Sequence, residues 1–236
     1  MPLLASNHIH VPAPNAYSLL MLFAILLSAY YWARVAKSDY RLPIIYAIAL
    51  GCAFLGAKVA YLLAEGWMHT GEDRWMHWLT GKSITGALLF GFISVEFCKK
   101  LLRYQKITGD RFAVIVPVGI IIGRIGCLTQ GCCQGCVISE AGNRWPAVPV
   151  EIGFNLLAIV VFMILRKGKH LPFQHFHLYL LGYGVFRFLH EFLRDTPKPF
   201  MGLSGYQIAC LVILLVATIA FRKRHVWLQK NTPISS

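Results

Sequence analysis

Residues 119–136 read GIIIGRIGCLTQGCCQGC and place one arginine, Arg124, inside a long apolar run. A guanidinium group well below a membrane surface costs about 2.5–3.5 kcal/mol on insertion scales and more in simulations, so it needs a partner or an aqueous cavity. Glycines on both sides of Arg124 allow backbone or ligand to approach closely. If the run lies in a membrane, it predicts a charged site inside a transmembrane helix.

The composition of the whole chain agrees with a membrane location. Of its 236 residues 57% are hydrophobic and 14% charged, and the mean hydropathy is +0.57. These values, with the apolar residues in blocks, predict a polytopic membrane protein. A formal charge of +13 could indicate nucleic-acid binding. The basic residues recur in short clusters between the apolar blocks, however. The enrichment of Lys and Arg in the cytoplasmic loops of membrane proteins explains this pattern better.

The apolar blocks predict an all-α integral membrane protein with seven transmembrane helices in a single membrane domain, residues 1–236. Most blocks have the 17–25 residues that a spanning helix needs, and the third and fifth are at or below that limit. Residues 65–82 are polar and aromatic and suit an interfacial loop or a helix lying on the membrane surface. The predicted spans are residues 16–33, 43–64, 84–98, 112–133, 150–165, 176–193 and 203–221.

Lysine and arginine alternate from side to side along these spans. Most of the 23 follow the first, third, fifth and seventh spans, in clusters such as Lys99-Lys100 and Arg222-Lys223-Arg224. Because cytoplasmic loops are enriched in Lys and Arg, the N-terminus is predicted outside and the C-terminus in the cytoplasm. This topology puts Lys58, Arg124 and the polar residues of the sixth span in the outer half of the membrane.

The sixth predicted span carries a polar stripe at intervals of three to four residues, which places its members on one helical face. The stripe consists of Tyr183, Arg187, Glu191 (or His190) and Arg194. An internal ion pair that joins helices would explain it in part. One carboxylate cannot neutralise Arg124, two stripe arginines and Lys58, although Lys58 could also extend towards the interface. The surplus of cations favours an anion such as a phospholipid phosphate, which arginine binds with a bidentate fork.

Four cysteines follow Arg124 in the pattern C-x4-C-C-x2-C. Cys127, Cys132, Cys133 and Cys136 could bind a metal, but zinc sites usually combine paired C-x2-C hooks. Small polarizable residues packed near the membrane interface are the favoured interpretation. No metal and no cofactor are therefore expected. Because most of the seven cysteines lie within apolar runs, a secreted disulfide framework is not expected either.

Three stretches of the sequence resemble motifs of one protein family. Residues 123–135 (GRIGCLTQGCCQG) resemble the signature loop of the bacterial prolipoprotein diacylglyceryl transferases, and residues 182–195 (GYGVFRFLHEFLRD) resemble that family's second arginine motif. Residues 202–207 (GLSGYQ) resemble its last-helix motif, and Tyr17 falls where the family has a tyrosine at the start of its first span. The resemblance covers about residues 15 to 221. It implies the same seven-span topology.

The resemblance implies a reaction in the bacterial cytoplasmic (inner) membrane, with the active site facing the outer leaflet. Such enzymes transfer the diacylglyceryl group of phosphatidylglycerol to the lipobox cysteine thiol of a prolipoprotein signal peptide and release glycerol phosphate. Arg124 and Arg187 are expected to hold the phosphate in the transition state, with Glu191 fixing Arg187 as the third catalytic group. The expected substrate-binding residues are Tyr17, Lys58, Gly126, Gly135, Tyr183, Arg194 and Gln207.

The chain also departs from the family at defined positions. Thr85 stands where many members have a histidine at the start of the third span, and Lys58 replaces an arginine. The family's Pro-x-Gln-Leu-Tyr-Glu stretch reads PVEIGF here, from residue 149 to 154. The base that activates the thiol is therefore open between His190, Glu151 and the arginine field alone. A paralogue with another acceptor and a non-catalytic lipid-binding protein are alternatives; without an inverted repeat, a transporter is less favoured.

Overall fold

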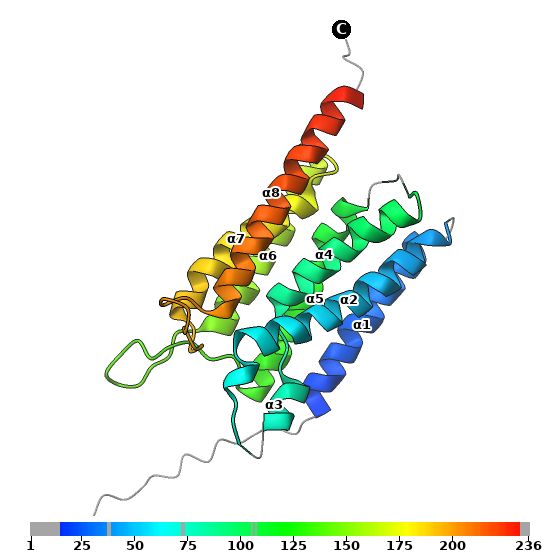
Figure 1. Cartoon of the computed structure of the whole chain (residues 1–236). Coiled ribbons are helices and arrows are strands. Elements are labelled where there is room, and N and C mark those ends of the chain that lie inside the picture. The colour runs from blue at the N-terminus through cyan, green and yellow to red at the C-terminus, as the bar shows by residue number, and fades with distance from the viewer. Residues whose placement is uncertain (1–14, 37–38, 72–73, 105, 107, 232–236) are drawn as a thin grey trace, which may run out of the picture.

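The protein is an assembly of helices. The computed structural model describes residues 15–36, 39–71, 74–104, 106 and 108–231, and within these ranges it has eight α-helices and two 3₁₀ turns (Figure 1). In chain order they are α1 (Asn15–Val35), α2 (Arg41–Ala64), η1 (Gly66–Met68), α3 (Arg74–Thr80), α4 (Ile84–Leu101), α5 (Gly109–Gln130), α6 (Ala147–Lys167), α7 (His175–His190), η2 (Glu191–Leu193) and α8 (Gly205–Asn231). Extended pairing in the described ranges is limited to isolated bridges. The all-α prediction is confirmed.

Every predicted apolar run forms a helix, and five of these helices are long and apolar enough to cross a membrane: α1, α2, α5, α6 and α8. The other two differ for simple reasons. The last turns of α4 carry Glu96, Lys99 and Lys100, and α7 has only 16 residues. The short α3 lies in the polar and aromatic segment, where a surface helix was one expectation.

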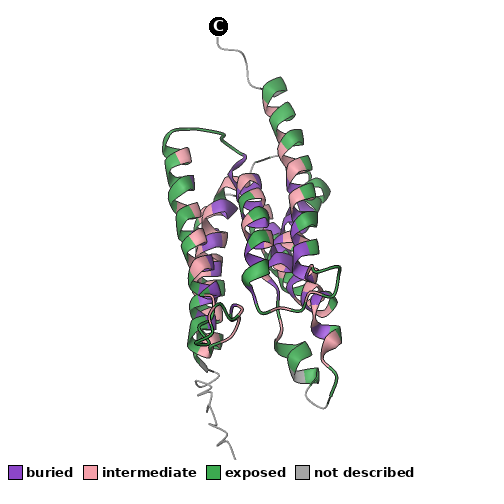
Figure 2. Cartoon of the chain, turned by 90° about the vertical axis from the view of Figure 1, so that its left-hand side faces the viewer, coloured by how far each residue is buried: buried purple, intermediate pink, exposed green. Residues whose placement is uncertain are grey.

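The outer faces of the long helices are apolar. Leu157, Val161 and Ile164 on α6 are exposed, as are Leu22 and Leu26 on α1. Figure 2 shows exposed residues along the outward side of each helix and buried residues where helices meet. Apolar surface of this extent is unusual on a soluble monomer and suits lipid contact.

Small residues bring α2 and α4 into close contact. A Cβ added at Gly86 would lie 2.2 Å from the backbone oxygen of Gly56, so neither position has room for a side chain. Small residues at such crossings are typical of membrane helix pairs. Elsewhere α7 packs along α8, and α5 contacts α1, α6 and α7. The resulting core is aromatic and includes Trp32, Phe112 and Phe176.

Several helix ends differ from the predicted span ends; α8, for example, continues to Asn231 beyond residue 221, and two other differences bear on the site. α5 ends at Gln130 rather than residue 133, because Gly131 adopts a left-handed backbone (φ 63°) and caps the helix. α7 ends at His190: Glu191 begins the 3₁₀ turn η2, and Arg194 has an extended backbone. The continuous helical stripe predicted through Arg194 is therefore wrong beyond His190.

Candidate active site

Two arginines from different helices share one buried carboxylate. Glu151 of α6 has no exposed surface, and its Oε2 lies 2.7 Å from Nη2 of Arg124 on α5. The same Oε2 lies 3.6 Å from Nη1 of Arg187 on α7. Arg124 and Arg187 are themselves about 6% and 5% exposed. The two guanidinium groups therefore point into one shared site, as the sequence analysis expected.

A second buried carboxylate extends this network. Glu191 is fully buried, and its Oε2 lies 2.7 Å from Nη2 of Arg187 and 3.5 Å from Nε of Arg194. Its Oε1 accepts hydrogen bonds from the hydroxyls of Thr196 (2.7 Å) and Ser204 (3.3 Å). Glu191 thus joins the end of α7 to the segment that leads into α8.

The fold explains why residues far apart in sequence meet here. The C-terminal part of α5, the first turns of α6, the end of α7 and the start of α8 lie at the same end of the molecule (Figure 1). In this arginine network three guanidinium groups form ion pairs with two carboxylates. Glu65 and Lys198 also lie beside Arg194, so one positive charge is still in excess. A net cation held among apolar helices can attract an anion from the lipid.

Glu151 is the residue that sequence reasoning did not include in the site, where it appeared only as one possible base. The available signal was a carboxylate near the start of an apolar run, at the same predicted membrane depth as Arg124. When Glu151 is counted, the excess of cations over carboxylates becomes smaller but remains positive.

Tyr183 and Gln207, two of the expected substrate-binding residues, are hydrogen-bonded to groups in or next to the arginine network. The Tyr183 hydroxyl donates to Oε1 of Glu151 at 2.9 Å. Gln207 accepts from the Ser204 backbone N–H at 2.8 Å and donates to the Phe188 carbonyl at 3.2 Å. Tyr183 and Gln207 are fully buried. They hold the start of α8 and Glu151 in place around the arginines.

The two expected glycines lie where the chain is crowded. A Cβ on Gly126 would come within 2.8 Å of the Tyr17 ring, which places Tyr17 of α1 against the last turns of α5. A Cβ on Gly135 would lie 2.2 Å from the Trp145 backbone oxygen. Gly135 also forms an isolated bridge with Arg194. Both glycines therefore bring backbone close to the arginine network.

Lys58 is placed differently from the three arginines. Its Nζ donates to the backbone oxygens of Trp78, Leu79 (2.8 Å) and Gly81 (3.0 Å), at the C-terminal end of α3. A cation at a helix C-terminus satisfies carbonyls that have no partner within the helix. Of the four cations expected together, the structure joins the three arginines in one network and gives Lys58 backbone partners.

The two candidate bases and the residue at the family's histidine position are all engaged in other contacts. Thr85, at that histidine position, is buried, and its hydroxyl lies 2.6 Å from the Ser83 hydroxyl at the start of α4. His190 accepts a hydrogen bond on Nε2 from the Trp145 indole at 3.1 Å. Glu151 is paired with two arginines. His190 and Glu151 would each have to give up a contact to take a proton from a thiol.

Three donors in the arginine network remain open. Nε of Arg124, Nη1 of Arg187 and Nε of Arg194 are buried and make no hydrogen bond with any residue that the structure describes. The 3.6 Å separation between Nη1 of Arg187 and Glu151 is an ion-pair distance but too long for a hydrogen bond. Donors of this kind suit an oxygen-rich anion such as a phosphate.

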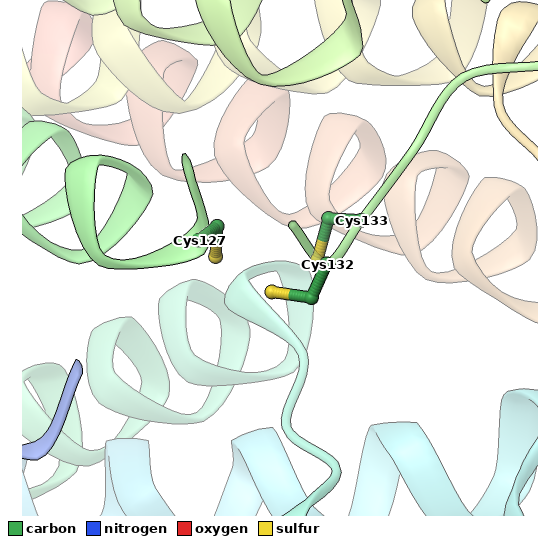
Figure 3. A group of neighbouring side chains, drawn as sticks. All are labelled: Cys127, Cys132 and Cys133. Atoms are coloured by element: carbon green, nitrogen blue, oxygen red, sulfur yellow. The ribbon is translucent and has the colours of Figure 1, made fainter. Parts of the chain in front are cut away.

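Three cysteine sulfurs meet beside this network. The Sγ atoms of Cys127, Cys132 and Cys133 all lie within 4.8 Å of one another, and Figure 3 shows the three side chains pointing together. Cys127 Sγ also lies 3.7 Å from Nη1 of Arg124. Cys136, the fourth cysteine of the pattern, is not part of this group. Spacing alone did not indicate this convergence, because Cys132 and Cys133 follow the turn that Gly131 makes.

Two neighbouring cavities lie towards the C-terminal ends of α4 and α8, away from the arginine network. They measure about 570 and 490 Å³, and both are lined by Glu96, Arg224 and Trp227. Neither is lined by a residue of the arginine network. The candidate site is therefore defined by its converging charges.

The chain is similar in sequence to known proteins. Residues 7–222 match the sequence model of the family described as prolipoprotein diacylglyceryl transferase. A phosphatidylglycerol–prolipoprotein diacylglyceryl transferase of Aeromonas hydrophila is 30% identical over 219 residues, which are 86% of this chain and 77% of the relative. Proteins with the same description from Aliivibrio fischeri (32% over 200 residues; 78% and 69%) and, as a second copy, from Clostridium perfringens (26% over 205 residues; 75% and 77%) are also similar. The chain therefore belongs to the prolipoprotein diacylglyceryl transferase family.

Proposed function

We propose that this chain transfers the diacylglyceryl group of phosphatidylglycerol to the lipobox cysteine thiol of a prolipoprotein. The relatives carry this activity in their descriptions. The observation that carries the proposal in this chain is the buried arginine network, in which Arg124 and Arg187 converge on the single carboxylate of Glu151.

The arginines can stabilise the charge that develops in such a reaction. Attack of a thiolate on glycerol C3 breaks the bond from that carbon to the phosphate oxygen, and the leaving phosphate gains negative charge. Guanidinium groups already held in place favour this transition state over the less charged ground state. The Glu151 carboxylate occupies the position between Arg124 and Arg187, so the lipid phosphate would take its place when it binds.

The neighbouring residues would position these groups. Glu191 holds Arg187 and Arg194 from the side of α8, and Tyr183 holds Glu151. Gly126 and Gly135 let the Tyr17 ring and the Trp145 backbone pack close beside the arginines. Tyr17 and Arg194 are assigned as further substrate contacts, whereas Gln207 and Lys58 act through the start of α8 and the end of α3.

The membrane arrangement is part of the proposal. We assign α4 and α7 as spans beside the five longer helices, because α4 packs along α2 and α7 along α8. The alternation of Lys and Arg then favours an outer N-terminus, a cytoplasmic C-terminus and a site at the outer leaflet of the bacterial cytoplasmic membrane.

Labelled phosphatidylglycerol and a lipobox peptide, incubated with the full-length protein in detergent, test the activity. We expect the label in a thioether on the peptide cysteine, and a loss of at least about 100-fold in Arg124→Ala and Arg187→Ala. Arg111→Ala is the matched control, because Arg111 is an exposed arginine at the other end of α5. It should keep the wild-type rate.

The same experiment separates the alternatives. Full activity in both arginine variants would remove the proposed mechanism. Turnover of phosphatidylglycerol with no label on the peptide would indicate another acceptor. Binding of phosphatidylglycerol without any turnover would favour a lipid-binding protein and overturn the proposal.

A further inference from the structure

The transfer requires a thiolate, and the structure leaves its origin open. A free cysteine thiol is mostly protonated near neutral pH, and the thiolate is the reactive form. Nε2 of His190 accepts from the Trp145 indole, and Glu151 is paired with Arg124 and Arg187. A bound metal ion would be a further means of removing the proton from the acceptor thiol.

The three-cysteine cluster has the dimensions of a metal site. Its three Sγ atoms lie within 4.8 Å of one another and belong to side chains that point together (Figure 3). Three thiolates around Zn²⁺ at about 2.3 Å require sulfur–sulfur separations of about 3.8 Å, so a small inward movement would bring the ligands into place. All three cysteines are free thiols.

The position of the cluster fits a role in the transfer. Cys127 Sγ is 3.7 Å from Nη1 of Arg124, and Nη1 of Arg194 donates to the Cys133 backbone oxygen at 3.5 Å. Cys127 is buried, whereas Cys132 and Cys133 are partly exposed. The cluster therefore touches two arginines of the network on one side and is accessible on the other.

The net charge of the arginine network also favours Zn²⁺. The arginine network holds one uncompensated positive charge, because three guanidinium groups face two carboxylates. Three thiolates around Zn²⁺ carry one negative charge. N–H donors beside coordinating groups are the usual second layer of a metal site, and Nη1 of Arg124 is placed to act as one. Soft thiolate ligands select Zn²⁺ or Cu⁺ over hard cations, and the charge balance favours Zn²⁺.

We propose that Cys127, Cys132 and Cys133 bind Zn²⁺ and that its fourth coordination position takes the acceptor cysteine as a thiolate. This inference rests on the proposed transferase function and supplies its missing activation step. Zinc sites with three protein ligands keep an open position for water or substrate. A thiol that coordinates such an ion is deprotonated outright.

The step is balanced without an oxidant or a reductant. The acceptor thiol gives its proton to solvent as its sulfur binds the ion. The sulfur then uses an electron pair to form the bond to glycerol C3, and the electrons of the broken carbon–oxygen bond stay on the phosphate. The thioether that forms is a weaker ligand than the thiolate and leaves the ion.

Metal content and cobalt spectroscopy test the site. The full-length protein, purified in detergent through a tag without histidine, should hold close to one zinc per chain. Replacement by Co²⁺ should give a thiolate-to-cobalt charge-transfer band. Cys127→Ser, Cys132→Ser and Cys133→Ser should each weaken binding by at least tenfold to 100-fold. Cys136→Ser, which changes a cysteine outside the cluster, should bind normally.

The acceptor role has its own readout. A lipobox peptide with cysteine should intensify the cobalt band, whereas the same peptide with serine should not. Chelation should lower transfer on the order of 100-fold, and Zn²⁺ should restore it. Since Cys→Ser variants could fail to fold, chelation and reloading of the wild-type protein provide the test that needs no substitution.

Several outcomes would overturn the inference. One is full transfer activity in protein that holds no zinc and gives no cobalt band. Another is a disulfide among the three cysteines in the active protein, which mass spectrometry would detect. A bound ion that neither the peptide nor chelation affects would be structural and would also end the proposal. If zinc and peptide bind as expected but phosphatidylglycerol is never consumed, the transferase function fails instead.

Discussion

Replacing Glu151 by glutamine removes the carboxylate that Arg124 and Arg187 share. The side chain keeps its size and an oxygen that can accept from Tyr183, so packing changes little. The two guanidinium groups lose their common counter-charge, at 2.7 Å and 3.6 Å. We expect a less stable protein with a higher affinity for an anionic phospholipid, because the phosphate no longer competes with a carboxylate.

The size of the effect follows from burial. Removing one partner of a buried ion pair destabilises a protein by about 3–5 kcal/mol, because the other charge stays buried without compensation. Glu151 is fully buried and both arginines are nearly so. The retained hydrogen-bond acceptor and the remaining contact between Arg187 and Glu191 place the expected loss at the lower end, about 3 kcal/mol.

Thermal unfolding in an uncharged detergent measures this loss, with and without added phosphatidylglycerol. Glu151→Gln should unfold at a lower temperature, and the lipid should raise that temperature by more than it does in the wild type. Glu140→Gln is the matched control, because Glu140 is exposed in the loop before α6. If the lipid stabilises wild type and Glu151→Gln equally, the shared carboxylate does not hold the place of a phosphate.

Three further substitutions test the surrounding structure. Gly56→Ala should separate α2 from α4, since its Cβ would lie 2.6 Å from a backbone oxygen of α4; Gly51→Ala, on the same helix with open space around it, should be neutral or stabilising by up to about 1 kcal/mol in thermal unfolding. Gly135→Ala should lower the transfer rate more than stability, because its Cβ would meet a loop backbone oxygen at 2.2 Å, whereas Gly119→Ala should leave the rate unchanged. Lys58→Met should increase hydrogen exchange or proteolysis around the end of α3 with little change in lipid affinity, and a large loss of affinity would show that Lys58 contacts the substrate.

The helices were predictable because apolar runs of membrane length have few other structures available to them. In lipid every backbone group needs a partner within the chain, so each run had to become a helix. The exact ends followed from local details. Gly131 adopts a left-handed conformation that ends α5, and such a cap depends on the geometry of the turn as much as on the presence of glycine.

The site was predictable only in part. Arg124, Arg187 and Glu191 stood out as charges within apolar runs, and the structure joins them. The role of Glu151 depends on how α6 is rotated against α5 and α7, and spacing within one helix does not report this. Lys58 shows the converse case: it lies in the half of the membrane predicted for the arginines, but its partners are backbone oxygens at the end of α3.

The two carboxylates of the network differ in a way that assigns them different parts. Both carboxylate oxygens of Glu191 contact partners between residues 187 and 204, the continuous segment that leads from α7 into α8. Loss of these contacts would destabilise that segment. Glu151 receives its partners from α5 and α7 while standing near the start of α6. Its exchange for a phosphate would replace one anion between Arg124 and Arg187 by another and leave the helix ends tied together. Under the proposed function, Glu191 would be the fixed counter-charge and Glu151 the carboxylate that the phosphate displaces.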